Sequence, residues 1–342
     1  MSSELESQAW FESTFIGFLF RQFATPKPLP PGIRLTDQVA VVTGSNVGIG
    51  FEASRHLLSL GLSHLIMGVR SQSKGESAAA QLRKEFPAAA VSVWILDMQS
   101  YDSVRAFVDE CATLPRLDAV ILNAALMNIS YRTAATTGHE LTMQVNYLST
   151  ALLTTLLLPV LKAKKIPGAP RPPVICVVGS DLAYRVDVET RGSLLQHFNT
   201  PEGFGQFLWY GRSKVLLTFF LTKLAEFVNP DDVLVNMPNP GTTRGTAFFR
   251  EFSTLVTKII AIGQFLIARP AATAATTYLD AALVRGKESH GCFVSDWAIK
   301  PYPQFWYTAE GKEFGEKLWE ETMEELNFAG ASKVIQDMSA SR

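Results

Sequence analysis

Short apolar runs alternate along this chain with longer stretches of helical periodicity. Six of the runs predict buried strands, because they are short, rich in branched side chains and bounded by turn residues. The predicted strands are 38–42, 64–69, 91–96, 117–122, 174–178 and 233–237. The predicted helices are 51–60, 74–86, 101–113, 140–162, 211–228 and 310–326.

This alternation predicts an α/β fold, in which a mostly parallel, doubly wound sheet carries helices on both faces. Ligands of such sheets bind at the carboxyl ends of the strands, near the point where the strand order reverses. The chain has no internal repeat, so a single domain over residues 36–300 fits best. We expect an N-terminal extension over 1–35 and a helical tail over 301–342.

The composition is that of a globular protein, with 47% hydrophobic and 18% charged residues. A net charge of −1 offers no electrostatic case for a nucleic-acid partner. Cys111, Cys176 and Cys292 lie far apart in the sequence and have no metal-ligand spacing. They predict buried thiols in a reducing compartment such as the cytoplasm, with neither a metal site nor a disulfide framework.

Residues 10–23 are rich in aromatic side chains, but their longest apolar run covers only residues 15–20. A membrane-spanning helix needs about 20 apolar residues. The segment also lacks the features of a secretory signal. It is expected to form a short helix, which either packs on the protein's own surface or contacts a membrane surface. The four prolines at 26, 28, 30 and 31 then form a stiff linker that ends the helix.

A glycine-rich turn joins the strand at 38–42 to the helix at 51–60. Glycine adopts backbone conformations that other residues avoid, and it lets a diphosphate approach the main chain. The free N–H groups at the start of the helix then attract an anion. The turn therefore predicts a dinucleotide-phosphate loop, with contacts from Gly44, Ser45, Asn46, Val47, Gly48, Ile49 and Gly50.

The end of the second strand indicates which dinucleotide binds. NAD-specific sites usually carry an acidic residue there, which holds the ribose 2′-hydroxyl. Here Val69 is followed by Arg70, with Lys74 one helical turn later. A guanidinium suits a 2′-phosphate because it forms paired, charge-assisted hydrogen bonds. NADP(H) is therefore predicted, although Lys74 is equally well explained as a solvated surface charge.

Tyr210 and Lys214 are four residues apart on a predicted helix and so share one face. They follow the strand that leads to Ser180. Together with the glycine loop, Asp97, Asn123-Ala124 and Asn146, they occur in the order of the short-chain dehydrogenase/reductase family, which the chain resembles over about residues 36 to 245. Residues 70–76 and 145–146 resemble its retinol-dehydrogenase-like branch. The tail at 288–296 and the N-terminal extension resemble fungal reductases of secondary-metabolite pathways.

The resemblance implies a Rossmann-type sheet of about seven strands in the order 3-2-1-4-5-6-7. It also implies hydride transfer between NADP(H) and a carbonyl or secondary alcohol of a hydrophobic small molecule. Tyr210 would be the general acid or base. Lys214 would lower the pKa of Tyr210 and hold the nicotinamide ribose, Ser180 would orient the substrate oxygen, and Asn146 would anchor a water of a proton relay.

The resemblance also implies further cofactor contacts. Asp97 would meet the adenine, and Asn123 would stabilise the central strand beside the cofactor. Pro240, Gly241 and Thr243 would lie beside the nicotinamide. The threonine that the family usually has here falls at Gly245 in this chain, so Thr242 and Thr246 are alternatives to Thr243.

In this family the segments 181–209 and 242–267 wall the substrate pocket, and here both are rich in apolar side chains. Such a lining suits a bulky apolar substrate. The second segment could equally pack on the core or on a partner subunit. The aromatic residues expected in the first wall are Tyr184, Phe198, Phe204, Phe207 and Trp209.

Two alternatives to a soluble reductase stay open. Ala125 stands where the family usually has glycine, and together with the displaced threonine it leaves room for a non-catalytic NADP(H)-binding regulatory protein. Residues 10–23 leave room for a retinol- or lipid-type dehydrogenase at a membrane surface. The sequence does not distinguish a monomer from a homodimer.

Overall fold

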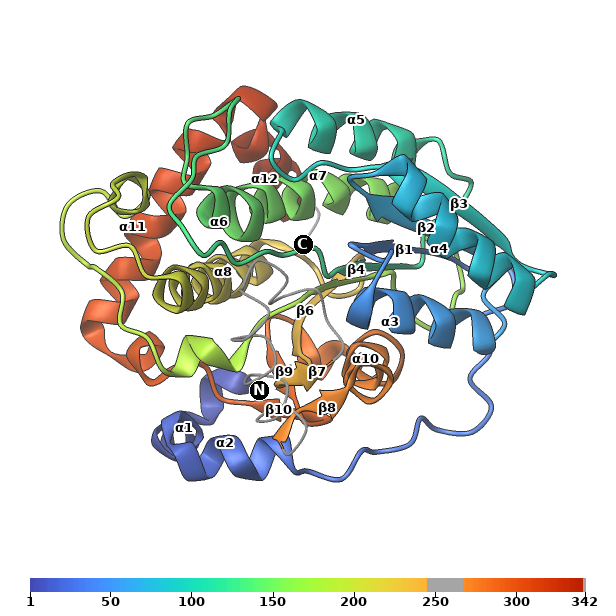
Figure 1. Cartoon of the computed structure of the whole chain (residues 1–342), viewed down its shortest axis with the longest axis horizontal. Coiled ribbons are helices and arrows are strands. Elements are labelled where there is room, and N and C mark those ends of the chain that lie inside the picture. Colours follow the sequence, from blue (N-terminus) through green and yellow to red (C-terminus); the bar gives the residue numbers. More distant parts are fainter. Residues whose placement is uncertain (245–266, 341–342) are drawn as a thin grey trace.

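The structure is a computed structural model that describes residues 1–244 and 267–340. Among these residues, eight strands form one sheet in the order β10-β9-β6-β5-β4-β1-β2-β3 (Figure 1). Neighbouring strands from β3 across to β9 run parallel, and only β10 is antiparallel to its neighbour. The predicted order 3-2-1-4-5-6-7 is confirmed, with an eighth strand added at one edge. The strands are β1 (Val39–Thr43), β2 (His64–Val69), β3 (Ala90–Ile95), β4 (Ala119–Leu122), β5 (Val174–Val177), β6 (Leu234–Asn239), β9 (Phe293–Ser295) and β10 (Ala298–Lys300).

Helices cover both faces of this sheet (Figure 1). One apolar cluster joins the sheet to α5 (Tyr101–Ala112), α7 (Ser149–Ala163) and α8 (Gln206–Phe227), with α11 (Ala309–Glu325) and α12 (Ala331–Ser339) outside them. The other cluster joins the opposite face to α3 (Gly48–Ser59), α4 (Gln72–Glu85) and α10 (Ala271–Leu279). The expected helix over 310–326 thus corresponds to α11. The helices α10 and α12 were not predicted, nor was the position of the seventh strand, β9, or the existence of the eighth, β10.

The alternation of side chains along β1 shows how the two clusters arise. Val39 and Val41 belong to the first cluster, and Ala40 and Val42 belong to the second, because successive side chains of a strand point to opposite faces. Burying a valine completely stabilises the fold by about 1.5–3 kcal/mol. Since both faces of the strand are covered, polar chemistry is confined to the ends of the strands.

The predicted helix at 140–162 is divided into three parts. A short turn, α6 (Leu141–Met143), passes through a π-helical turn over Gln144–Leu148 into α7. A π-helical turn widens the helix locally and often occurs at functional sites. Leu141–Ala163 is long and apolar enough to cross a membrane, but 83% of its most apolar window is buried inside the protein. It therefore fits the core helix that the sequence predicted.

The N-terminal extension forms two helices where one was predicted. They are α1 (Glu6–Ser13) and α2 (Phe15–Gln22), and we call the pair the N-terminal hairpin. Thr14 divides them, because its extended backbone ends α1 and its hydroxyl accepts a hydrogen bond from Gly17 N at 3.0 Å. A threonine N-cap is a signal that the sequence contained. The hairpin lies beside β10, and the linker then runs around the molecule to β1 (Figure 1).

A partly buried ion pair joins the C-terminal tail to the loop before α6. His139 Nε2 lies 3.0 Å from a carboxylate oxygen of Glu325, at the end of α11. Burial works against the charged imidazole, but the hydrogen bond and charge of Glu325 outweigh it and raise the pKa of His139 above its ordinary 6.5. Burial likewise opposes the Glu325 carboxylate, yet His139 lowers the pKa of Glu325 below its ordinary 4.5.

This pair predicts a pH-dependent contribution to stability. The contribution from His139 is complete below the ordinary histidine pKa and is lost as the pH rises through the raised value, whereas that from Glu325 is lost at acidic pH. Glu325→Gln should therefore lower the free energy of unfolding by about 1 kcal/mol near pH 6 and by less near pH 9, measured by urea denaturation. Glu324→Gln removes the same charge from an exposed neighbour and should have no such pH dependence. Equal effects of Glu325→Gln at both pH values would contradict the assignment.

Candidate active site

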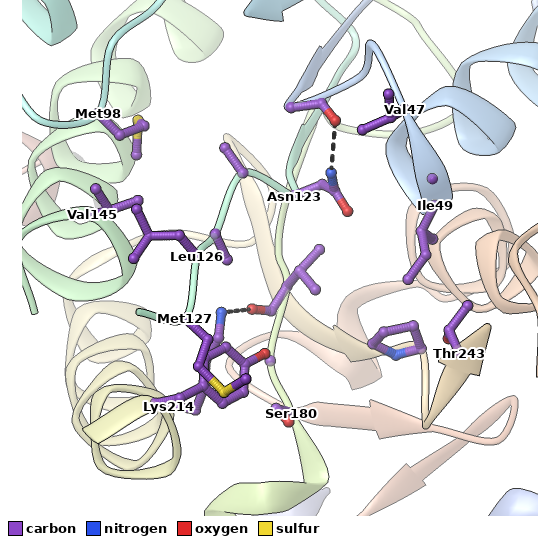
Figure 2. Close-up of a pocket in the computed structure, with 18 of the residues that line it drawn as sticks. Val47, Ile49, Met98, Asn123, Leu126, Met127, Val145, Ser180, Lys214 and Thr243 are labelled. Carbon is purple, nitrogen blue, oxygen red and sulfur yellow. Dashed lines mark hydrogen bonds between the residues drawn. The ribbon is translucent and has the colours of Figure 1, made fainter. Parts of the chain in front are cut away.

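A cavity of about 540 Å³ lies at the carboxyl ends of the parallel strands. Its wall is built from the loops after β1, β2, β3, β4, β5 and β6, together with residues of α2, α8 and α10. This is the place where doubly wound sheets bind ligands, beside the switch in strand order at β1 and β4. Figure 2 shows Val47 and Ile49 of the glycine loop at one side of the cavity, with Ser180 and Lys214 further along it.

The glycine loop has the geometry of an anion site. Gly44 and Gly48 have φ values of +64° and +61°, which side chains other than glycine rarely tolerate. Helix α3 begins at Gly48, and no side chain caps its first turn, so its leading N–H groups are available to a ligand. The loop residues on the cavity wall are Gly44, Asn46, Val47, Gly48 and Ile49.

Two predicted contact residues of this loop lie behind the wall instead. Ser45 is fully buried, and its hydroxyl has no hydrogen-bond partner among the described residues. A Cβ atom at Gly50 would lie 2.6 Å from Asn123 Nδ2 and 2.7 Å from the Gly44 carbonyl oxygen. The structure therefore explains Gly50 by the close packing of α3 on the end of β4.

Asn123 holds the loop against the central strands, in the manner expected of it. Its Nδ2 donates to the carbonyl oxygens of Thr43 at 3.0 Å and Gly44 at 3.3 Å, and Figure 2 shows one of these two bonds. Its Oδ1 accepts a hydrogen bond from the Tyr278 hydroxyl at 3.1 Å. Tyr278 comes from α10 and lines the cavity. No sequence signal pointed to Tyr278, because it is 155 residues from Asn123.

Cationic groups gather where β2 ends. Arg70 and Lys74 are exposed and line the cavity, and neither is engaged by a hydrogen bond or an ion pair within the described residues. Ser71, which was not predicted, joins them as the N-cap of the 14-residue helix α4, and it makes no side-chain capping bond. Asp97 lines the same region, where its carboxylate accepts a hydrogen bond from Gln99 N at 3.0 Å. A helix N-terminus beside two free cations is well suited to a phosphate.

Ser180, Tyr210 and Lys214 come together at the other end of the cavity. All three are buried and line it. Lys214 Nζ donates to the Val178 carbonyl oxygen at 2.7 Å and lies 5.8 Å from the centre of the Tyr210 ring (Figure 2). The Ser180 hydroxyl, which follows β5, hydrogen-bonds the Tyr210 side chain. The expectation that Tyr210 and Lys214 share one face of a helix is met within α8.

Burial moves the two titrating groups in opposite directions. Burial raises the pKa of Tyr210 to about 12, although the hydrogen bond with Ser180 opposes the shift. Burial lowers the pKa of Lys214 to about 7. In both cases the low-dielectric surroundings favour the neutral form. The residues of the chain by themselves therefore keep the phenol protonated at neutral pH.

Asn146 lies behind the cavity wall. Its carboxamide accepts from Leu126 N at 2.9 Å and donates to Leu126 O at 2.9 Å and to the Ser213 hydroxyl at 3.2 Å. These bonds fasten the π-helical turn to the loop after β4 and to α8. The side chain thus has a structural role, and its part in a proton relay stays a prediction.

Pro240, Gly241, Thr242 and Thr243 line the cavity after β6. Gly241 has a φ of +70°, and the Thr243 hydroxyl donates to its carbonyl oxygen at 3.0 Å. Thr246 and the apolar residues predicted over 246–266 lie outside the described residues. Both Thr242 and Thr243 therefore stay open as contacts to a ligand.

The substrate wall differs from the prediction for residues 181–209. Of the five aromatic residues expected there, only Phe207 lines the cavity. Trp209 packs in the core edge-on against Phe198 and at a tilt against Phe204, with ring centres 5.7 and 5.5 Å apart, and Tyr184 packs beneath Arg21. Those rings fill the space between helices and do not reach the cavity. The wall is completed by other residues, namely Phe18, Met127, Asp181, Leu182 and Arg185.

Comparison with known proteins identifies the class. The family model described as short chain dehydrogenase matches residues 38–170. The chain is 63% identical over 341 residues to the short chain dehydrogenase virL of Hypocrea virens, covering 100% of both chains. The chain therefore belongs to the short-chain dehydrogenase/reductase family, whose members are oxidoreductases.

Further relatives and solved structures agree with this class. The short chain dehydrogenase/reductase mfmJ of Annulohypoxylon moriforme is 42% identical over 330 residues, which cover 96% of this chain and 95% of the relative. A Shigella flexneri short chain dehydrogenase complexed with NADP has a TM-score of 0.56 at 20% identity, covering 78% of this chain and 99% of that one. The Pseudomonas aeruginosa RhlG/NADP active-site complex has a TM-score of 0.57 at 20% identity, covering 82% and 100%. The two structures share the fold, and the likeness to the retinol-dehydrogenase branch stays a prediction.

Proposed function

We propose that this chain is an NADP(H)-dependent reductase of a carbonyl group on a hydrophobic small molecule. The observation that carries the proposal is the convergence of Ser180, Tyr210 and Lys214 on the cavity that also holds the glycine loop. The reduced nicotinamide would supply the hydride when bound. The chain would orient the carbonyl oxygen through Ser180 and protonate it through Tyr210.

The electrostatics of the pair favour Tyr210 as a proton donor. A charged Lys214, whose Nζ lies 5.8 Å from the centre of the Tyr210 ring, would stabilise the phenolate and so lower the pKa of Tyr210. Burial raises the pKa of Tyr210 to about 12, and a charged Lys214 would oppose this shift. The phenol thus holds its proton at neutral pH, as the reduction of a carbonyl requires. Alcohol oxidation would need a further positive charge near the phenol.

The preference for NADP(H) over NAD(H) rests on the surroundings of Arg70. Arg70, Lys74 and the uncapped start of α4 at Ser71 present positive potential to one end of the cavity. No acidic residue lies directly at the end of β2, where an NAD-specific site would use one to bind the ribose hydroxyls. A 2′-phosphate would therefore be bound, and its absence would leave these cations unpaired.

The opposite end of the cavity indicates the substrate class. Phe18, Met127, Leu182 and Phe207 present apolar surface near Ser180 and Tyr210. Apolar burial would provide most of the affinity for the substrate. Together with the fungal origin of the relatives virL and mfmJ, this lining supports a polyketide- or terpenoid-like intermediate of secondary metabolism, reduced in the cytoplasm.

The acid role of Tyr210 has a direct test. Tyr210→Phe removes the hydroxyl and keeps the ring, so turnover of a reactive hydrophobic ketone should fall by at least about 100-fold, since general acid catalysis contributes about 10²–10⁴-fold. NADPH affinity, measured by quenching of protein fluorescence, should change little. Tyr131→Phe, at a half-buried tyrosine outside the cavity, is the matched control. Unchanged turnover in Tyr210→Phe would refute the assignment. A wild-type protein that binds NADPH but reduces no carbonyl would favour the regulatory alternative.

Cofactor preference is tested by Arg70→Ala. Losing charge-assisted hydrogen bonds worth about 1.5–3 kcal/mol should raise the KM for NADPH by about 10- to 100-fold and leave that for NADH nearly unchanged. Arg34→Ala, which removes an exposed arginine outside the cavity, should alter neither. An equal rise in KM for NADPH and for NADH would show that Arg70 does not bind the 2′-phosphate.

A membrane-surface dehydrogenase is the second candidate, favoured by the outer face of the N-terminal hairpin. Large apolar side chains are exposed there, including Trp10 at 66% and Phe20 at 70% of their full accessibility. Phe18 of the same helix lines the cavity, so a substrate leaving a lipid surface would arrive near the site. The exposed set is Trp10, Phe11, Phe15, Ile16, Phe20 and Phe23.

Membrane contact is tested without disturbing the buried side of the hairpin. Replacing Phe15, Ile16 and Phe20 by serine should reduce co-sedimentation with neutral phosphatidylcholine vesicles by about tenfold, because each side chain would contribute roughly 1 kcal/mol or more of interfacial burial. Ile129→Ser, at an exposed apolar residue elsewhere, is the control. If neither the wild type nor the triple variant sediments with vesicles, the candidate fails and the soluble reductase stands.

A further inference from the structure

The N-terminal hairpin is held on the body of the protein at both of its ends. At the start, the Ser2 hydroxyl accepts a hydrogen bond from Phe293 N of β9 at 3.0 Å. In the middle, the buried Glu12 carboxylate pairs with Arg21 and with Lys300 of β10, the latter at 2.9 Å. Breaking one partner of a buried ion pair is strongly destabilising, because the other charge is left uncompensated. The hairpin is therefore a built part of the molecule.

At the C-terminal end of α2, Gln22 binds the loop that follows β6. Gln22 is buried, and its Nε2 donates to the carbonyl oxygens of Thr242 and Ile267, each at 2.8 Å. Its Oε1 accepts from Thr242 N at 2.9 Å. One carboxamide thus joins the backbone at Thr242 to the backbone at Ile267. Arg269 also binds Gln22, because its Nε donates a hydrogen bond to the Gln22 carbonyl oxygen at 3.1 Å.

The chemistry of this contact is specific to a primary amide. The amide group offers two donors and an acceptor, and in Gln22 all three functions are engaged by backbone atoms. The neighbouring Gly241 is shaped to receive it, because a Cβ atom there would lie 2.8 Å from Gln22 Oε1. A carboxylate in the same place would face two carbonyl oxygens, and an alkyl chain would leave buried backbone groups unpaired.

The loop that Gln22 grips belongs to the cavity. Pro240, Gly241, Thr242 and Thr243 all line it. They follow β6, which is next to β5 and its Ser180 in the sheet, whereas Arg70 and Ser71 follow β2, on the far side of β4 and β1. Gln22 does not line the cavity itself, so it acts through the loop. Phe18, one turn earlier on α2, does reach the cavity wall.

We propose that Gln22 is a positioning residue, through which the N-terminal hairpin sets the loop 240–243 for binding of the nicotinamide half of the cofactor. This inference rests on the proposed NADP(H)-dependent function. The N-terminal hairpin then forms part of the wall of the active site. Phe18 faces the substrate, and Gln22 holds the loop 240–243 that contacts the cofactor. A change at Gln22 should then weaken the binding of the nicotinamide half of the cofactor and leave the binding of the adenosine half nearly unchanged.

The experiment compares two ligands in the full-length protein. Gln22→Met keeps the length of the side chain and removes its donors and acceptor. It should weaken NADPH binding by about tenfold, as expected for the loss of hydrogen bonds to buried groups, while the binding of 2′,5′-ADP changes by less than about twofold. Calorimetric titration of both ligands gives the ratio. Gln22→Asn keeps the amide but shortens its reach, and it should fall between the wild type and Gln22→Met.

Gln8→Met is the matched control, because Gln8 is exposed on α1 of the same hairpin, and it should alter neither affinity. Equal weakening of NADPH and 2′,5′-ADP by Gln22→Met, with a lowered melting temperature, would show a merely structural role and overturn the inference. Unchanged NADPH binding in both Gln22 variants would also overturn it. A wild-type protein that binds neither ligand would instead refute the proposed cofactor itself. Should Gln22→Met fail to fold, Gln22→Asn supplies the same ratio of affinities.

Discussion

The structure depends on one constraint, which is that its central sheet must be covered on both faces. Parallel strands with apolar side chains on either side are stable only between two layers of helices. In β1, Val41 faces one layer and Val42 the other, and both are fully buried. No polar group can reach solvent through such a sheet. Ligand chemistry is thereby restricted to the loops at the strand ends, where the glycine loop, Arg70 and Ser180 all lie.

Side-chain amides hold the loops at the strand ends in position. Loops have few apolar contacts, so they depend on directed hydrogen bonds from side chains. Asn123 supplies these bonds for the glycine loop, Asn146 for the loop after β4, and Gln22 for the loop after β6. Each is an amide that satisfies backbone donors or acceptors lacking a partner strand. The loops that line the cavity are therefore held in place by an outer set of side-chain amides.

Sequence reasoning captured the features that depend on neighbouring residues. The strand 64–69 coincides with β2, and the spacing of Tyr210 and Lys214 placed both on one face of α8. Arg70 was found because it directly follows its strand. What such reasoning missed depends on contacts between distant residues. Gln22 and Thr242 are 220 residues apart, and neither carries a local signal of the other.

The errors in the prediction have the same origin. The aromatic residues over 184–209 could not be assigned to a cavity or to the core from composition alone, and most of them pack in the core. The short strands β9 and β10 contain too few residues to show a period. The break between α1 and α2 was different, because Thr14 is a recognisable helix cap and could have been used.

The hydrogen bond between Ser2 and Phe293 joins residues 291 positions apart. The N-terminal segment can therefore attach to the sheet only after β9 has been made. During synthesis α1 and α2 are made long before their binding surface on β9 and β10. Until then Ser2 and Glu12 lack the partners on β9 and β10 that they bind in the folded protein. Contacts of such long range form slowly. A chain that has been made only as far as β6 therefore contains the glycine loop, Ser180 and Tyr210 but lacks the strands to which the hairpin is attached in the folded protein.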